Sequence, residues 1–483
     1  MRESPTGKKG SKKSMSQSTS SPKPIRTGLQ NIMIRDVPSY ANKFFYSLGF
    51  LSAISFLLLV ISGIIMAAAG PHWWITSTLG QYFRSFHLWA TQAFVVFILL
   101  HLTIVFLTSG YKGARKFTWV LGVFMFLFAL AEAEFGYVLR GDFSSQYRSL
   151  QGADLYNGSG IGGVLNNLNT GQVMGIHLVV LPLTLIALIL AHYFLVRVLG
   201  ISKPSPAADA YPMSKANHVV LFWRGGAVVV VVAALALVFP SPYLAPLTIS
   251  KIASNDPALI SKTLVAEFDH SSDTATYFDN INPYTFDSRA VFIETPYNQL
   301  KAAQTTPDQL KLFLAEPADL QVKQLEAATT YYASDNASKT LPKGNPAIAV
   351  VDSLTTMAKS GLYEAALRNN NGTGYETTYV VRFLADTGVP DDTATSLNMT
   401  TPQYGMVREE AGTLPPGAWW LAPIGLLNHT VLANDDNGDH DAALIIGTFL
   451  LVLIAFPFIP FVNRLPEKLG VYKLIWRKPS ARK

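Results

Sequence analysis

The chain has 483 residues, of which 49% are hydrophobic and only 14% are charged, with a formal net charge of +6. This composition is typical of an integral membrane protein. The absence of cysteine excludes disulfides and cysteine-ligated metal clusters within this chain. The charge is divided unevenly, because residues 241–441 contain 12 Lys and Arg against 24 Asp and Glu, which leaves 26 and 8 in the remainder. Nucleic acid is therefore a poor explanation of the basic residues, and none is expected as a partner.

Residues 1–38 are rich in Ser, Lys and Pro and contain no apolar run. We expect a disordered basic tail there and no cleavable signal peptide. Six apolar stretches of membrane-spanning length follow. They are Phe44–Ala69, Phe86–Ser109, Trp119–Leu139, Val173–Leu199, Val219–Phe239 and Ala442–Val462. The predicted fold class is therefore an all-α transmembrane protein.

The short loops after the second and fourth spans are basic, as are both tails of the chain. Their charges come from Lys112, Arg115, Lys116, Arg197, Lys203 and Lys215. The positive-inside rule therefore predicts a multi-pass protein of the cell membrane with both termini in the cytoplasm. By the same rule the acidic segment Ser241–Asp441 is extracytoplasmic.

The acidic segment contains no further apolar run of membrane-spanning length. Residues 306–333 have helical periodicity, whereas VVRFL at 380–384 and AVFIET at 290–295 are predicted to be short strands. We therefore expect a small inserted α+β domain. The predicted organisation is a tail at 1–38, a four-helix bundle at 39–205, a fifth helix at 206–245, the extracytoplasmic inserted domain at 246–414, a loop with the sixth helix at 415–463 and a basic tail at 464–483.

Four of the nine histidines lie in two of the apolar stretches. His87 and His101 are 14 residues apart, and His177 and His192 are 15 apart. At about 100° per residue, both spacings return the side chains to within roughly 60° of one helix face, with an axial rise of roughly 21 to 23 Å. Two such helices facing each other form two His–His pairs, one near each membrane surface. A lone histidine is explained by a hydrogen bond between helices, but four at matched spacing favour two haems, each held by two imidazoles.

Haem between helices requires space beside the backbone, and glycine provides it. The first span contains Gly49 and Gly63, and the third contains Gly122 and Gly136. Both pairs are spaced by 14 residues, the interval between His87 and His101. Glycine is also a common packing residue in membrane helices, so neither pair alone indicates haem. The spacing that both pairs share with the histidines is what indicates two haems.

Arg84 lies one turn before His87. It is placed to meet a haem propionate at the outer surface, and an arginine that reaches the membrane interface explains it equally well.

These motifs resemble the cytochrome b subunit of quinol-oxidising cytochrome bc and bf complexes. The resemblance covers Pro38 to Pro204 and includes the four glycines, R-x-x-H-x13-H, GYVL at 136–139, H-x4-P at 177–182 and VRVLGISKP at 196–204. The 15-residue spacing is similar to that of the bf type. The resemblance implies a four-helix diheme bundle with two further helices, in which His87 and His177 ligate the outer haem and His101 and His192 the inner one. Both haems would be of the non-covalent b type.

The resemblance also implies the reaction. Quinol would be oxidised near the outer surface, with proton release. One electron would pass through both haems to a second quinone, and the other would pass to a Rieske iron–sulfur protein. That protein must be a separate subunit, because this chain lacks cysteine. Further implied partners are another electron-acceptor subunit (a cytochrome or copper protein), membrane lipid and a second copy of the chain in a homodimer.

The chain departs from the family at the quinol pocket. The family has a Pro-Glu-Trp-Tyr motif there, and this chain reads PPGAWWLAPIGLL. Pro416, Trp419 and Trp420 resemble the motif, but Ala418 stands where its Glu would be. Oxidation of a quinol releases two protons, so another carboxylate is needed as an acceptor.

Two glutamates of the third span are the candidates for this role. We hypothesise that Glu134, or Glu132, accepts a proton beside Tyr137. The alternative is that both glutamates reach interfacial water or pair with Arg140. The family's GYVLPWGQ is GYVLRGDF here, so Arg140 and Asp142 are expected to alter the floor of the pocket.

Arg197 resembles an arginine near the inner quinone site of bf-type proteins, although contact with lipid headgroups explains a basic loop residue as well. Two other functions stay open. A cytochrome b membrane anchor of a dehydrogenase or reductase would not need the tryptophan motif. A haem-free transporter or assembly factor would use the buried histidines for protons or metal.

Overall fold

The computed structural model describes residues 36–202, 213–279, 286–300, 307–333, 344–369, 377–400, 417–435 and 437–475. Most of the predicted N-terminal tail, Lys203 and Pro416 lie outside the described residues.

Six helices are long and apolar enough to cross a membrane, which confirms the predicted number of spans. They are Leu48–Ala69 (α2), Thr78–Leu107 (α4), Gly113–Val138 (η3 and α5), Thr170–Leu199 (α7, η4 and α8), His218–Val238 (α9) and His440–Phe458 (within α21 and η10). Helices are expected here because lipid offers no partner for backbone N–H and C=O groups. The second helix begins eight residues before the predicted span, because the Ser77 side chain caps it by accepting from the Gly80 N–H.

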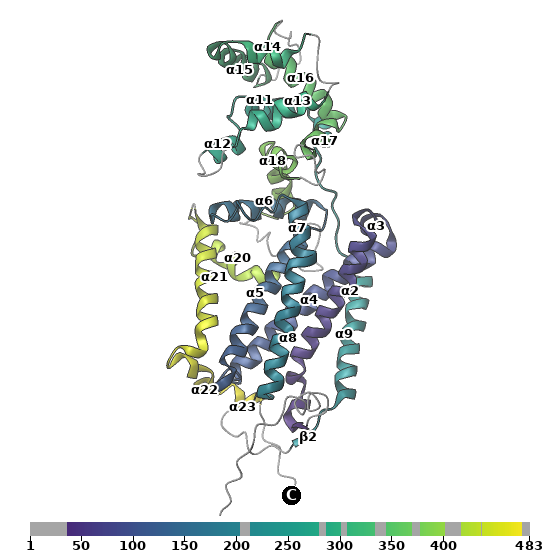
Figure 1. Cartoon of the computed structure of the whole chain (residues 1–483), viewed down its shortest axis with the longest axis vertical. Coiled ribbons are helices and arrows are strands. Elements are labelled where there is room, and N and C mark those ends of the chain that lie inside the picture. Colours follow the sequence, from purple (N-terminus) through teal and green to yellow (C-terminus); the bar gives the residue numbers. More distant parts are fainter. Residues whose placement is uncertain are drawn as a thin grey trace, which may run out of the picture.

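The spans form a bundle with one helix at its edge (Figure 1). Helix α2 packs along α4, α5 packs along α8, and α9 contacts both α2 and α4. Helix α21 (Gly438–Ala455) contacts α5. Each glycine-bearing helix therefore lies beside a histidine-bearing helix. At the end of the bundle that carries the first and last described residues, which we call the tail side, a two-stranded antiparallel sheet joins β1 (Asp36–Pro38) to β2 (Met213–Lys215).

The opposite end of the bundle carries short helices and the inserted segment, which is our name for residues 246–414. Helix α3 (Pro71–Thr76) follows α2, and α6 (Phe143–Gly158) lies across the end of the bundle (Figure 1). The described helices of the inserted segment are α10 (Ile249–Asn255), α11 (Pro257–Phe268), α12 (Asp273–Asp279), η6 (Ala290–Glu294), α13 (Thr295–Gln299), α14 (Gln309–Ala315), α15 (Ala318–Ala333), α16 (Pro346–Lys359), α17 (Leu362–Arg368), α18 (Thr378–Asp386) and α19 (Val389–Ser396). After it come η9 (Trp419–Leu421), α20 (Ala422–His429), η11 (Val462–Arg464), α22 (Leu465–Leu469) and α23 (Tyr472–Ile475).

The α+β prediction for the inserted segment is wrong, because the described residues between 246 and 400 are helical wherever they are regular. AVFIET forms η6 and the start of α13, and VVRFL lies within α18. Val380, Phe383 and Leu384 are all buried in one core, and their spacing of three and one residues puts them on one helix face. A short apolar run has no period that distinguishes this arrangement from a strand.

The inserted segment has an apolar core of its own and rests on α6. Fully buried aromatic side chains in this core include Phe268, Phe292, Phe313, Tyr363 and Phe383. Phe143 and Tyr147 of α6 pack with Ala394 and Met399, and Ala153 of α6 packs with Val381. The inserted segment therefore covers this end of the bundle.

Two neighbouring carboxyl groups, one buried and one half-buried, lie where two helices of this core meet. Glu267 of α11 is fully buried and lies beside Asp386 of α18. Burial, together with the neighbouring Asp386, raises the pKa of Glu267 to about 10. The Ser272 hydroxyl donates to Glu267 Oε2 at 2.8 Å. Glu267 is therefore a neutral carboxylic acid at pH 7.

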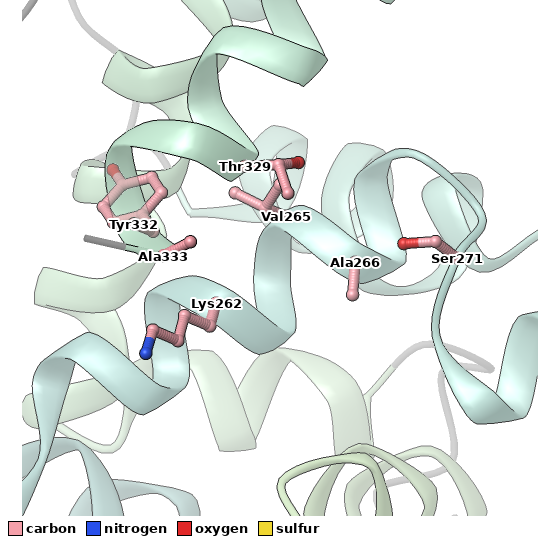
Figure 2. Close-up of a pocket in the computed structure, with 7 residues that line it drawn as sticks. All are labelled: Lys262, Val265, Ala266, Ser271, Thr329, Tyr332 and Ala333. Carbon is pink, nitrogen blue, oxygen red and sulfur yellow. The ribbon is translucent and has the colours of Figure 1, made fainter. Parts of the chain in front are cut away.

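A cavity of about 270 Å³ lies between α11 and α15. Figure 2 shows Lys262, Val265 and Ala266 of α11 lining it opposite Thr329 and Tyr332 of α15. Its lining contains none of the four histidines of the membrane helices.

Candidate functional site

The four histidines lie in two pairs at different depths of the bundle. His87 of α4 and His177 of η4 face each other, with ring centroids 6.4 Å apart and ring planes inclined by 75°. We call them the insert-side pair, because they lie toward the end that carries the inserted segment. His101 of α4 and His192 of α8 are close enough to interact electrostatically. They form the tail-side pair.

Both rings of the insert-side pair are held through Nδ1. Ser62 Oγ lies 2.8 Å from His87 Nδ1. The Nδ1 of His177 lies 3.1 Å from the backbone oxygen of Glu132 and 3.2 Å from its Oε1. A ring nitrogen engaged in this way leaves the other, Nε2, as the metal ligand.

Each of the four glycines lies against one of the four histidine rings. A Cβ added at the glycine would approach the ring Cε1 to 3.3 Å at Gly49 (His101), 3.4 Å at Gly63 (His87), 3.6 Å at Gly122 (His192) and 2.9 Å at Gly136 (His177). Real Cβ atoms essentially never show contacts under 3.0 Å, so Gly136 is the position where a side chain is least tolerable. The glycines therefore open space beside the rings themselves.

A π-helical turn explains why the second histidine spacing is one residue longer than the first. Residues Ile176–Val180 form a π-helix, and the Leu181 N–H donates to the Ile176 carbonyl, five residues back. Pro182, which follows at the start of α8, has no N–H to continue an α-helical ladder. Such a turn inserts one extra residue into a helix. The turn therefore absorbs the additional residue between His177 and His192.

The insert-side pair has the geometry that a bis-imidazole iron site requires. Two metal–imidazole bonds of about 2 Å each, with the depth of each ring added, place two ring centres roughly 6 Å apart. The observed separation of 6.4 Å agrees with this. Within the described ranges, no group of three or more His, Cys, Asp or Glu side chains is arranged to hold a metal ion. The two imidazoles would be able to hold one haem iron between them.

Arg84 and Arg140 both pair with Asp142. The Arg84 guanidinium contacts Asp142 Oδ2, and Arg140 Nη2 lies 2.8 Å from the same oxygen. Asp142 is fully buried and caps α6 through a hydrogen bond from the Ser145 N–H. These charges therefore tie α4 and the end of α5 to α6. Contact of Arg84 with a haem propionate stays a prediction.

The tryptophan motif packs against the insert-side ends of α4 and α5. Ala418 is fully buried in a cluster with Leu88, Tyr137, Trp420 and Leu421. A glutamate at this position would place its carboxyl among apolar side chains, which is costly without a partner.

Gln92 lies at the centre of this contact, although it is not among the site residues predicted from the sequence. The Trp419 Nε1 donates to Gln92 Oε1 at 2.6 Å. The amide Nε2 of Gln92 donates to the Gly417 carbonyl at 3.3 Å and to the Tyr137 hydroxyl at 3.4 Å. Its signal in the sequence is an uncharged polar residue within an apolar span, five residues after His87.

The two glutamates of α5 point to different partners. Glu132 lies against His177, as described above. Glu134 Oε1 lies 3.9 Å from Arg148 Nε of α6, and its side chain is 28% exposed. The Arg148 guanidinium stands 4.6 Å from the centroid of the Tyr137 ring. Glu134 therefore lies where α5 meets α6, close to Tyr137.

Arg197 lies near the tail-side end of α8, where its guanidinium stands 5.8 Å from the centroid of the Tyr193 ring. Its predicted role at an inner quinone site stays a prediction.

Comparison with known proteins agrees with the resemblance read from the motifs. A family model described as "Cytochrome b(N-terminal)/b6/petB" matches residues 92–246. Cytochrome b6 of Heliobacterium mobile is 28% identical over 197 residues, covering 36% of this chain and 92% of the relative. Cytochrome b6 of Oltmannsiellopsis viridis is 30% identical over 194 residues, covering 35% of this chain and 88% of the relative.

Among solved structures, a chain of "Hyperthermophilic respiratory Complex III" aligns with a TM-score of 0.35 and 16% identity, covering 68% of this chain and 92% of that one. The sequence relatives carry the assignment, because the match covers nearly the whole length of each relative. The chain belongs to the cytochrome b family of quinol-oxidising bc and b6f complexes.

Proposed function

We propose that this protein is the diheme cytochrome b of a respiratory complex that oxidises quinol at the insert-side end of the bundle. The observation that carries the proposal is the insert-side pair, whose rings are 6.4 Å apart and lie against Gly63 and Gly136. Hydrogen bonding at Nδ1 supports the assignment of Nε2 of both rings to the metal. The rings of the tail-side pair also lie against glycines, His101 against Gly49 and His192 against Gly122.

The chain's own residues would hold two b-type haems without covalent attachment. His87 and His177 would hold one, and His101 and His192 the other. When bound, the haems supply one-electron carriers at two depths of the membrane. The protein sets the distance between them through the spacing of the histidines along α4 and α8.

The quinol would bind where the tryptophan motif meets α4 and α5. Gln92 and Tyr137 provide polar groups beside the apolar side chains Leu88, Ala418 and Leu421, and a few polar groups among apolar side chains are the usual composition of a small-molecule site. Oxidation of one quinol releases two electrons and two protons. One electron would go to the insert-side haem and the other to a Rieske iron–sulfur subunit, which in turn passes it to a further acceptor subunit.

Glu134 is the proposed proton acceptor. It lies two residues from Glu132, whose carboxyl is directed to His177, and three residues before Tyr137. Because its side chain is 28% exposed, a proton that it accepts can pass to water at the insert-side surface. That surface is proposed to be extracytoplasmic, since the basic loops lie at the other end.

Haem content tests the proposal. The purified wild-type protein should show a b-type reduced-minus-oxidised spectrum with two haems per chain. His87→Leu should lose one haem and His101→Leu the other, so that each variant keeps one, with a different reduction potential. A wild-type chain without haem, or with a single haem, would refute the proposal.

The quinol site is tested separately. Glu134→Gln should slow quinol oxidation and flatten its rise with pH while leaving both haems bound, and an unchanged rate at every pH would remove Glu134 from the mechanism.

Co-purification of a Rieske subunit distinguishes electron bifurcation from a membrane anchor that only passes electrons to or from quinone.

A further inference from the structure

We propose that Glu132 is a positioning residue for the insert-side haem, which orients His177 and lowers the reduction potential of the iron that His177 would bind. This inference rests on the proposed function, because it requires His177 to be an axial ligand.

Contacts from α5 hold the His177 ring in place. Two oxygens of one residue converge on its Nδ1, the backbone oxygen of Glu132 at 3.1 Å and the carboxyl Oε1 at 3.2 Å. The ring is therefore restrained by a main-chain atom and a side-chain atom of α5. Gly136, one turn further along α5, lies against the Cε1 edge of the same ring.

The Glu132 carboxyl group lies in a largely buried environment. The Glu132 side chain is 19% exposed, and its Oε2 is buried without a hydrogen-bond partner among the described residues. A carboxyl placed in a membrane helix is costly, and such groups generally serve a function there. Among the described residues, the Glu132 carboxyl group contacts the His177 ring.

The two rings of the insert-side pair differ in this respect. His87 Nδ1 meets the neutral hydroxyl of Ser62 at 2.8 Å, whereas His177 Nδ1 meets a carboxyl group. A carboxylate that accepts from the Nδ1–H of a ligating histidine fixes the tautomer and raises the basicity of Nε2. A more basic ligand stabilises the oxidised iron more than the reduced iron, so it lowers the potential.

The experiment is a redox titration of the haem-containing complex in the wild type and in Glu132→Gln. Glutamine preserves the size of the side chain and removes its negative charge. The reduction equilibrium of the insert-side haem should shift at least tenfold toward the reduced form, which is about 59 mV for a one-electron couple. The potential of the tail-side haem should stay unchanged. The single-haem variants His87→Leu and His101→Leu identify which wave belongs to which pair.

Glu134→Gln is the matched control, because it removes the same charge two residues away on the same helix, where the carboxyl faces Arg148 instead. It should leave the insert-side potential unchanged. The low-temperature electron paramagnetic resonance signal of the insert-side haem should move in Glu132→Gln and not in the control, which a general structural effect would not produce.

The outcomes separate this inference from the proposed function. An unchanged potential in Glu132→Gln, with two haems retained, overturns the role of Glu132 and leaves the haem assignment intact. A wild-type protein without haem at the insert-side pair refutes both. If Glu132→Gln loses the haem, Glu132→Asp is titrated instead. The shorter side chain moves the charge away from Nδ1, so a potential equal to that of the wild type would again overturn the inference.

Discussion

Replacing Gly136 with alanine should weaken haem binding at the insert-side pair without changing the fold of the bundle. The new Cβ would lie 2.9 Å from His177 Cε1 and 3.5 Å from both ring nitrogens. The ring cannot retreat freely, because Glu132 holds its Nδ1 and the π-helical turn fixes its backbone. Either the ring or the helix must therefore shift.

The size of the effect follows from the cost of overpacking. An extra methyl group in a tightly packed site costs about 1 to 3 kcal/mol. Because about 1.4 kcal/mol corresponds to a factor of ten, haem affinity at this pair should fall roughly 5- to 140-fold. The haem bound per chain, measured from the reduced spectrum during dilution or competition with a haem-binding acceptor, reports this loss.

Gly122 provides the matched comparison. An alanine there would place its Cβ 3.6 Å from His192 Cε1, an ordinary van der Waals distance. Gly122→Ala should therefore retain both haems, whereas Gly136→Ala loses the insert-side haem first. Equal retention of both haems in the two variants would refute the argument that Gly136 is required by the His177 ring.

Three further predictions concern stability and the quinol site. Asp142→Asn removes the negative charge that Arg84 and Arg140 share. Breaking a buried ion pair costs about 3 to 5 kcal/mol, so the unfolding temperature should drop. As a control, Asp154→Asn at an exposed position of the same helix should change the free energy of unfolding by less than about 0.5 kcal/mol. The pKa of Glu267 is raised to about 10 from its ordinary 4.5, so the folded carboxyl keeps a proton that the unfolded chain releases above pH 4.5. The inserted segment should therefore be most stable below pH 4.5 and lose stability as the pH rises toward 10. Hydrogen exchange of the α11 and α18 amides at pH 5 and pH 9 measures this change. Glu267→Gln should remove the difference in stability between the two pH values. Gln92→Leu leaves the half-buried Trp419 N–H without its acceptor, at a cost of about 1 kcal/mol. It should reduce kcat/KM for quinol roughly tenfold or more with both haems retained, and an unchanged kcat/KM would place the quinol elsewhere.

The membrane-spanning part of the fold is predictable from the sequence because its cause is local. A helix in lipid must satisfy its own backbone hydrogen bonds, so an apolar stretch of sufficient length is enough to identify a span. The histidine and glycine registers are also periodic along single helices. Their agreement predicts that glycines and histidines share a register along the bundle, and the structure adds that Gly63 lies at His87 and Gly136 at His177.

The inserted segment shows where local pattern is insufficient. VVRFL has the composition of a strand, but its helical conformation is decided by the core against which Val380, Phe383 and Leu384 pack. That core is assembled from residues distant in sequence, and a five-residue run contains no information about them.

The sequence by itself determined the six spans, the positions of the four histidines and the glycine register, because each follows from composition or from a period along one helix. The tertiary structure alone decided that Glu132 turns to His177 while Glu134 turns to Arg148, although the two lie two residues apart. It also decided that Asp142 joins two arginines and that Gln92 receives the Trp419 N–H. These contacts join segments up to 327 residues apart, and the partner of a buried polar group depends on which helices pack against its own.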